Sequence, residues 1–318
     1  MRDDMVVWSI LILIVFVIGV YLLLRKIYVE NKIKNGRQNL AGKVVLITGA
    51  SSGIGEALAM EFYLNGCKVI LAARRAGELE RVRRNLLNAQ LNNGIQSIRP
   101  DIVVLDLERI NELPDKVHQI LRTNLHVDIL INNGGISLRA DTLSVKQEVD
   151  CRLMNVNYFG AITLTKALLP SMIERKQGII IFVSSVVGRL PIPYRSAYTA
   201  SKSALQAFAD CLRAELYTHN IKVMVSSPGY VATEVSRNAL TGYGTLHGVM
   251  DPETEAGQRP QECAAEILRA TLRGDNEIMP IKYLPAVWLR ALLPSIYFAA
   301  LNRRAIKLAN RHNATQNV

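Results

Sequence analysis

Cysteine is scarce in this chain of 318 residues. The four cysteines form no Cys-x-x-Cys pair and have no histidine at metal-ligand spacing: Cys67, Cys151, Cys211 and Cys263. Such scattering argues against a disulfide framework and against a zinc site, and it is typical of a reducing compartment. We therefore expect small packed thiols and no metal.

The chain also lacks internal repeats, low-complexity segments and a boundary between two globular domains. Short apolar runs, expected as strands, alternate with amphipathic helical patterns from residue 42 onward. The strands are expected at 44–48, 69–72, 102–105, 129–131, 179–183, 223–226 and 278–281, and the helices at 56–64, 78–89, 113–123, 156–174, 200–217 and 261–273. This alternation predicts an α/β fold, namely one Rossmann-type doubly wound domain over 39–281 with a mostly parallel seven-stranded sheet.

An acidic residue is missing after the second expected strand, where NAD-binding proteins usually place one for the ribose hydroxyls. The chain has Arg74 and Arg75 there instead. A guanidinium suits a 2′-phosphate, so NADP(H) is favoured over NAD(H) unless both arginines point into solvent. Asp106, after the third strand, either accepts a hydrogen bond from the adenine amine or caps the next helix.

Glycine is concentrated where the first strand meets the first helix. The segment reads Thr48-Gly49-Ala50-Ser51-Ser52-Gly53-Ile54-Gly55. Glycine allows a tight turn and a close approach to a pyrophosphate, and the helix N-terminus offers free N–H groups. In this position the turn predicts a dinucleotide site.

Tyr198 and Lys202 are four residues apart, so a helix places them on one face. An ammonium group beside a phenol lowers its pKa and makes it a better acid–base catalyst at neutral pH. Ser185 follows the apolar run 179–183, at the end of a strand where open α/β sheets bind ligands. Its hydroxyl would donate to a substrate carbonyl oxygen beside Tyr198.

Taken together, these motifs resemble the short-chain dehydrogenase/reductase family over about residues 40–280. The set comprises 48–55, Asn132-Asn133-Gly134-Gly135, Asn157, Ser185, Tyr198, Lys202 and Pro228-Gly229. The approach Pro193-Tyr194-Arg195-Ser196-Ala197 and the stretch 164–173 are most similar to the membrane-anchored member-seven subgroup. Gly135 departs from the alanine common in the family and would loosen that turn slightly.

The resemblance implies the roles of several residues. Ser185 would orient the substrate carbonyl and Tyr198 transfer the proton. Lys202 would lower the Tyr198 pKa and hold the nicotinamide ribose, while Asn157 would kink its helix to hold a relay water. The cofactor would also contact the glycine turn, Arg74, Asp106, and the set Asn133, Gly134, Pro228, Gly229, Tyr230, Val231 and Thr233.

An uncharged apolar run covers Met5–Leu24, after a tail at 1–4. Twenty helical residues span a bilayer core of about 30 Å, and no cleavage site for a signal peptide follows. We predict a transmembrane anchor and a basic linker at 25–38. Because the basic flank stays inside, the catalytic domain should be cytosolic. The expected membrane is the endoplasmic reticulum, with the peroxisome as the alternative.

The net charge of +11 is concentrated at the two ends of the chain. No acid occurs in 278–318, which carries Lys282, Arg290, Arg303, Arg304, Lys307 and Arg311. This distribution favours anionic membrane lipid over nucleic acid as a partner. The aromatic extension at 282–318 is interrupted by Pro285, Arg290 and Pro294, so we expect it at the membrane surface, or packed on the core near the substrate mouth, rather than across the bilayer.

Two functions follow. The first is a membrane-anchored NADP(H)-dependent reductase of a lipophilic carbonyl compound such as a steroid or retinoid. The second is a non-catalytic nucleotide-binding membrane tether that works through protein partners, which would need none of the catalytic residues. The polar segment 235–259 would serve the first function as a lid. A homodimer is compatible with either.

Overall fold

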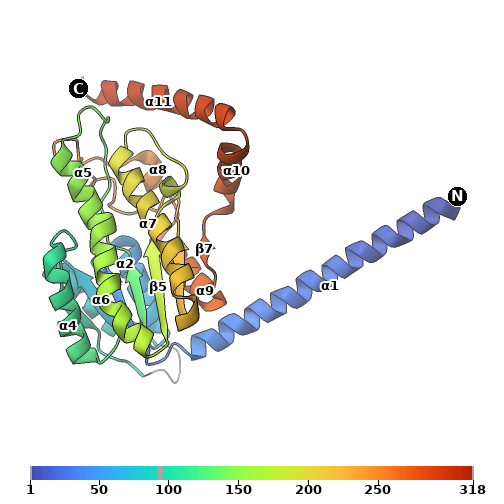
Figure 1. Ribbon diagram of the computed structural model, residues 1–318, viewed down its shortest axis with the longest axis horizontal. Helices are drawn as coiled ribbons and strands as arrows, with labels where there is room; N and C mark the ends of the chain where they lie inside the picture. Colours follow the sequence, from blue (N-terminus) through green and yellow to red (C-terminus); the bar gives the residue numbers. More distant parts are fainter. Residues whose placement is uncertain (1, 92–95, 317–318) are drawn as a thin grey trace.

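Seven parallel strands form the centre of the described part of the protein (Figure 1). The computed structural model describes the backbone of residues 2–91 and 96–316, and their side chains except at 2–7, 9–13 and 310–316. The strand order is β3-β2-β1-β4-β5-β6-β7. The strands are β1 Val44–Thr48, β2 Lys68–Ala73, β3 Asp101–Val104, β4 Ile129–Asn132, β5 Gly178–Val183, β6 Ile221–Ser226 and β7 Glu277–Ile278. The predicted seven-stranded parallel sheet is confirmed.

Helices cover both faces of the sheet. On one face lie α2 (Gly53–Leu64), α3 (Ala76–Leu87) and α9 (Pro260–Arg273), and on the other lie α4 (Leu113–Asn124), α6 (Gly160–Glu174) and α7 (Ser196–Glu215). Successive residues of β1 alternate between the two layers: Val45 and Ile47 pack with α2 and α9, whereas Val44 and Leu46 pack with α4 and α6. The fold is therefore doubly wound, as predicted.

The helix predicted at 156–174 is interrupted. Helix α5 (Gln147–Met154) is followed by a π turn, Asn155–Phe159, and then by α6. The Asn157 side chain points out of this turn, accepts a hydrogen bond from Ile136 N at 2.8 Å and donates one to Ile136 O at 2.9 Å. A wider turn is a common way to re-aim such a side chain.

The N-terminal segment forms one long helix, α1 (Arg2–Gln38), which projects from the domain in Figure 1. Its last turns pack on α9, where Gly36 lies against Leu272. Residues 14–24 are all exposed. Among the described residues, no helix has the length and hydropathy that a membrane span needs. The predicted anchor at 5–24 includes 5–7 and 9–13, which lie outside the described side chains, so the anchor stays a prediction.

The C-terminal extension begins with the short turn Ile281–Tyr283, continues as α10 (Leu284–Leu292) and ends as α11 (Pro294–Gln316). In Figure 1 these helices form an arm bent around one end of the domain. Tyr297 is buried, and Leu308 packs into an apolar cluster that includes Tyr198. This part of the extension thus packs on the core, one of the two predicted arrangements.

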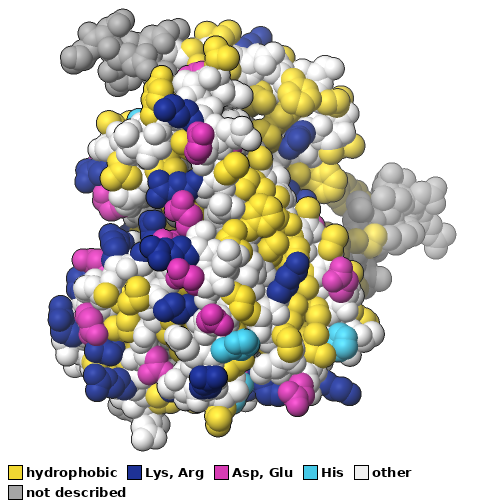
Figure 2. Space-filling model, turned by 60° about the vertical axis from the view of Figure 1, so that its left-hand side comes forward, with side chains coloured by type: hydrophobic (Ala, Val, Ile, Leu, Met, Phe, Trp, Pro, Cys, Tyr) yellow, Lys and Arg dark blue, Asp and Glu magenta, His cyan; other side chains and the backbone are white. Residues whose placement is uncertain are grey.

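Charge is mixed on the face drawn in Figure 2. Acidic and basic side chains are interspersed there, beside a band of apolar side chains. The ion pairs Arg81–Glu56 and Arg189–Glu277, both at 2.7 Å, are partly exposed to solvent. Neither sign of charge dominates this face.

Candidate active site

A cleft of about 940 Å³ opens at the carboxyl ends of the strands. Nearly all of the predicted site residues line it: Gly49, Ser51, Ser52, Gly53, Ile54, Arg74, Asp106, Asn133, Gly134, Ser185, Tyr198, Lys202, Pro228, Gly229, Val231 and Thr233. Thr48, Gly55 and Asn157 lie behind this lining. The size suits a bound dinucleotide or drug-sized ligand.

The glycine turn is shaped by backbone geometry. Gly49 and Gly53 have φ angles of +67° and +58°, a region that side chains disfavour. A Cβ on Gly55 would lie 2.2 Å from the Gly49 carbonyl oxygen, so helix α2 can begin this close to β1 only with glycine there. The turn is a cradle that any added side chain would fill, and it therefore fits a pyrophosphate.

Thr48 holds the cradle from behind rather than reaching into the cleft. Its buried Oγ1 accepts hydrogen bonds from the backbone N atoms of Asn133 and Gly134, both at 3.0 Å, and donates one to Ile131 O at 3.3 Å. The Asn133 amide in turn donates to Thr48 O at 3.0 Å. These bonds tie the end of β1 to the end of β4.

The two arginines after β2 behave differently. Arg75 donates to the hydroxyls of Ser51 and Ser52, at 3.0 and 3.1 Å, and so leans over the glycine turn. Arg74 is exposed at the edge of the cleft. Asp106 also lines the cleft, and it accepts a hydrogen bond from Glu108 N at 3.1 Å within its own turn, so it does not cap the next helix, whose N-cap position is Arg109.

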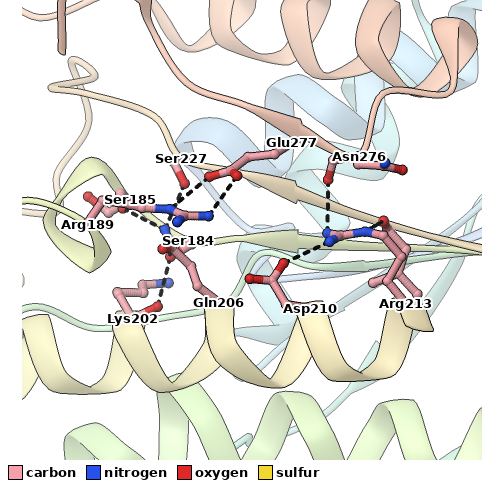
Figure 3. Close-up of polar contacts among 11 residues, drawn as sticks. Ser184, Ser185, Arg189, Lys202, Gln206, Asp210, Arg213, Ser227, Asn276 and Glu277 are labelled. Atoms are coloured by element: carbon pink, nitrogen blue, oxygen red, sulfur yellow. Dashed lines mark hydrogen bonds and ion pairs between the residues drawn. The ribbon is translucent and has the colours of Figure 1, made fainter. Parts of the chain in front are cut away.

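Ser185 is held at the end of β5 by a network that Figure 3 shows. The buried amide of Gln206, on α7, donates to Ser227 Oγ at 2.9 Å, to Ser184 Oγ at 3.3 Å and to Ser185 O at 3.4 Å. Ser184 Oγ also donates to Lys202 O at 3.1 Å. Gln206, which the sequence analysis missed, thus fixes the ends of β5 and β6 against the helix that carries Tyr198.

Tyr198 and Lys202, one turn apart on α7, both line the cleft. Burial raises the pKa of Tyr198, while a hydrogen bond with Ser185 and the charges of Arg195 and Arg139 lower it in part. Burial lowers the pKa of Lys202 to about 8, and its ammonium donates to Val183 O at 2.9 Å. The expected lowering of the Tyr198 pKa by Lys202 is not seen here, because the cations that act are the two arginines.

Asn157 sits behind Lys202. In addition to its two bonds with Ile136, its amide donates to Ser201 Oγ at 2.9 Å. The amide oxygen and both amide hydrogens are therefore engaged, so its side chain joins the loop after β4 to α7. A Cβ on Gly135 would lie 3.0 Å from Asn157 Oδ1 and 3.4 Å from Lys202 Nζ. A methyl group would be crowded here, so the glycine fits a tightly packed corner, and the looser turn expected from the sequence is not found.

The far wall of the cleft follows β6. Thr233 packs its methyl group against the glycine turn, where a Cβ on Gly53 would approach it to 3.0 Å. Tyr230 instead faces the other side, where its hydroxyl accepts a hydrogen bond from Arg304 at 3.0 Å. The segment expected as a lid also contributes to the lining, through Val235, Asn238, Leu240, Gly244, Thr245 and Leu246.

Comparison with known proteins identifies the family. The family model described as short chain dehydrogenase matches residues 43–243. A "Dehydrogenase/reductase SDR family protein 7-like" from Anopheles gambiae is 50% identical over 303 residues, covering 95% of each chain. The "Dehydrogenase/reductase SDR family member 7B" of Xenopus laevis is 42% identical over 306 residues, covering 96% of this chain and 93% of its own.

Solved structures show the same fold. A metagenomic short-chain oxidoreductase in complex with NADP has a TM-score of 0.60 at 25% identity and covers 76% of this chain and 97% of its own. A short-chain dehydrogenase/reductase from Burkholderia phymatum in complex with NAD has a TM-score of 0.70 at 22% identity, covering 79% and 94%.

The chain therefore belongs to the short-chain dehydrogenase family, a family of oxidoreductases. Within that family it is similar to the relatives named as dehydrogenase/reductase members 7 and 7B.

Proposed function

We propose that the protein transfers hydride between NADP(H) and the carbonyl or hydroxyl carbon of a lipophilic substrate at a membrane, with Tyr198 as the acid–base group. The observation that carries the proposal is that Ser185, Tyr198 and the buried Lys202 line the same cleft as the glycine turn. A nicotinamide cofactor would supply the hydride chemistry.

The chain's own residues would do the rest. Tyr198 would give its proton to the substrate oxygen during reduction and take it back during oxidation. Ser185 would donate a hydrogen bond to the same oxygen and fix its direction. Lys202 would bring a positive charge to the floor of the cleft, while Asn157 would hold the loop after β4 in place. A relay water at Asn157 stays an expectation from the family resemblance.

The preference for NADP(H) is supported by charge. No acidic residue stands at the end of β2 to pair with ribose hydroxyls, and Arg74 and Arg75 both line the cleft there. A guanidinium can bind a 2′-phosphate through forked donors, whereas a carboxylate would repel it. The glycine turn and the start of α2 would hold the pyrophosphate.

The membrane assignment is supported by exposed apolar side chains at both ends of the chain. Along α1, residues 14–24 have no protein neighbour that buries them. Along α10, α11 and the residue between them, the exposed large apolar side chains among the described residues are Leu284, Trp288, Leu292, Leu293, Ile296, Phe298 and Ile306. We propose that α1 anchors the protein and that the arm lies on the bilayer surface, which would let a lipophilic substrate enter without crossing water.

The competing tether function is weakened by the geometry, since a tether needs no Ser185, Tyr198 and Lys202 gathered in one cleft. Purified full-length protein should oxidise NADPH in the presence of at least one compound from a panel of steroid, retinoid and other lipid carbonyls. The matched control is Tyr198→Phe. If the protein binds NADPH but turns over no member of the panel in either direction, the tether is favoured.

A further inference from the structure

Three segments, each contributing one charged side chain, meet near Tyr198. None of these three side chains lines the cleft. Arg139 lies in the loop after β4, Arg195 directly precedes α7, and Asp251 belongs to the long segment between β6 and α9. Their side chains are only 10%, 13% and 16% exposed. They thus form a nearly buried ion cluster outside the residues assigned so far.

The cluster is held together by short contacts to one carboxylate. Arg139 Nε donates to Asp251 Oδ2 at 2.9 Å and to Oδ1 at 3.2 Å, and Arg195 Nη2 donates to Oδ2 at 2.9 Å. Arg139 also donates from Nη1 to Ser137 Oγ at 2.8 Å and to Leu138 O at 2.7 Å. Both guanidinium groups are therefore fixed in direction.

The charges in the cluster do not balance. Two cations share one anion, which leaves one uncompensated positive charge in a poorly solvated place. Such an arrangement costs stability, because burying an unpaired ion is unfavourable. Costly charge arrangements of this kind are concentrated at functional sites.

The cluster lies next to the side chain that is proposed to move the proton, Tyr198. Arg195 is three residues before Tyr198, and the residues on either side of Arg139, Leu138 and Ala140, belong to the apolar cluster against which Tyr198 packs. The charges of both arginines lower the pKa of Tyr198, opposing the effect of its burial. The cluster therefore acts on the group that is proposed to move the proton.

We propose that Arg139, Arg195 and Asp251 form a positioning cluster that sets how readily Tyr198 gives up its proton. Asp251 aims the two guanidinium groups and offsets part of their charge. Because Asp251 comes from the segment 235–259, docking of that segment over the cleft also assembles the cluster. The inference deepens the proposed function and rests on the role of Tyr198 in it.

Other polar groups also face this region and must be separated from the cluster. Ser185 lines the cleft with Tyr198 and contributes to lowering its pKa, and the buried Lys202 follows one helical turn later on α7. Tyr230 lies beneath Arg195, with the guanidinium carbon 5.8 Å from its ring centre. Its hydroxyl accepts a hydrogen bond from Arg304. Tyr283 packs in the same apolar cluster as Tyr198. Removing the negative charge of Asp251 and removing the positive charge of an arginine should shift the Tyr198 titration in opposite directions. This difference in sign distinguishes the ion cluster from these neighbours.

The test is a titration of Tyr198 itself in the full-length protein without substrate. Phenolate absorbance is recorded just after a rapid jump to alkaline pH, before unfolding, and the signal of the same protein carrying Tyr198→Phe is subtracted. Asp251→Asn should increase the ionised fraction several-fold, because two cations then act unopposed. Arg195→Met should decrease it several-fold, and Arg195→Lys should restore it towards wild type. A tenfold change corresponds to about one pH unit.

Two controls keep the result decisive. Arg237→Met, in the same segment but exposed and ion-paired with Glu234, should leave the titration unchanged. If Arg195→Met does not fold, Arg139→Met takes its place with the same expected direction. Equal titrations in all variants, or shifts of one sign for both Asp251→Asn and the arginine variant, would overturn the proposal. Since no turnover is involved, that outcome would leave the proposed reaction standing.

Discussion

The ammonium group of Lys202 donates a hydrogen bond to the carbonyl oxygen of Val183, 2.9 Å away, at the end of β5. The side chain is buried, and burial lowers its pKa from 10.5 to about 8. Keeping this cation buried therefore costs stability. Binding a cofactor that contacts the ammonium would offset part of that cost.

This burial predicts a dependence of stability on pH. Between about pH 8 and 10.5 the unfolded chain keeps a proton on Lys202 that the folded protein releases. Stability must therefore rise with pH through this window. Relative to Lys202→Met, the free energy of unfolding of the wild type should rise by on the order of 3 kcal/mol. Urea unfolding of both proteins across this range measures it, and parallel curves would contradict the burial argument.

Removing the phenol hydroxyl should separate chemistry from binding. Tyr198→Phe keeps the ring in its apolar cluster but removes the proposed proton donor, so kcat should fall by about 10²–10⁴-fold. The Kd for NADPH should change little, because the glycine turn and Lys202 remain. Steady-state rates and fluorescence titration with NADPH give the two values. A variant that retains the wild-type rate would remove Tyr198 from the acid–base role.

The arginines after β2 should differ in their effect on cofactor choice. Arg74→Glu should raise the KM for NADPH at least about tenfold more than that for NADH, because a repulsive carboxylate replaces a phosphate partner. Arg75 supports the serines of the turn, which serves both cofactors. Arg75→Glu should therefore weaken both. If only Arg75→Glu changes the preference, the 2′-phosphate partner is Arg75.

The arm formed by α10 and α11 should bind membranes on its own. A fragment that begins at residue 39 should bind vesicles containing anionic lipid, and salt should release part of it because exposed ion pairing is screened. Replacing Arg303 and Lys307 by Glu should weaken this binding, whereas Trp288→Ser should weaken it without changing the salt dependence. Sedimentation with vesicles measures each. Absence of binding at low salt would leave α1 as the proposed attachment.

The sheet could be predicted from the sequence because its strands are buried on both faces. Such strands appear as continuous apolar runs, and β1 matches the expected residues Val44–Thr48. The last strand was harder to place: Glu277–Ile278 is short, and the expected apolar residues at 279–281 continue into the turn before α10. Local composition indicates burial better than it indicates where pairing stops.

The site was predictable where spacing within one element decides it, as for Tyr198 and Lys202 on α7. It was not predictable where distant segments meet. The family resemblance implied a kink at Asn157 but not its bonds to Ile136, 21 residues earlier, and Arg139 meets Asp251, which is 112 residues later. Likewise, Gln206 resembles an ordinary polar helix residue until the fold brings Ser184, Ser185 and Ser227 around it. No local pattern encodes these contacts.

The strand order also has a consequence for synthesis. β1 pairs with β2, and then with β4, through contacts such as Val45 with Ile129. While the chain emerges from the ribosome, β1, β2 and β3 can pair early, but one edge of β1 stays open until β4 has been made. An open apolar edge is prone to wrong pairing during that interval. Slowing translation before residue 129 should therefore lower the yield of folded protein more than slowing it after residue 183.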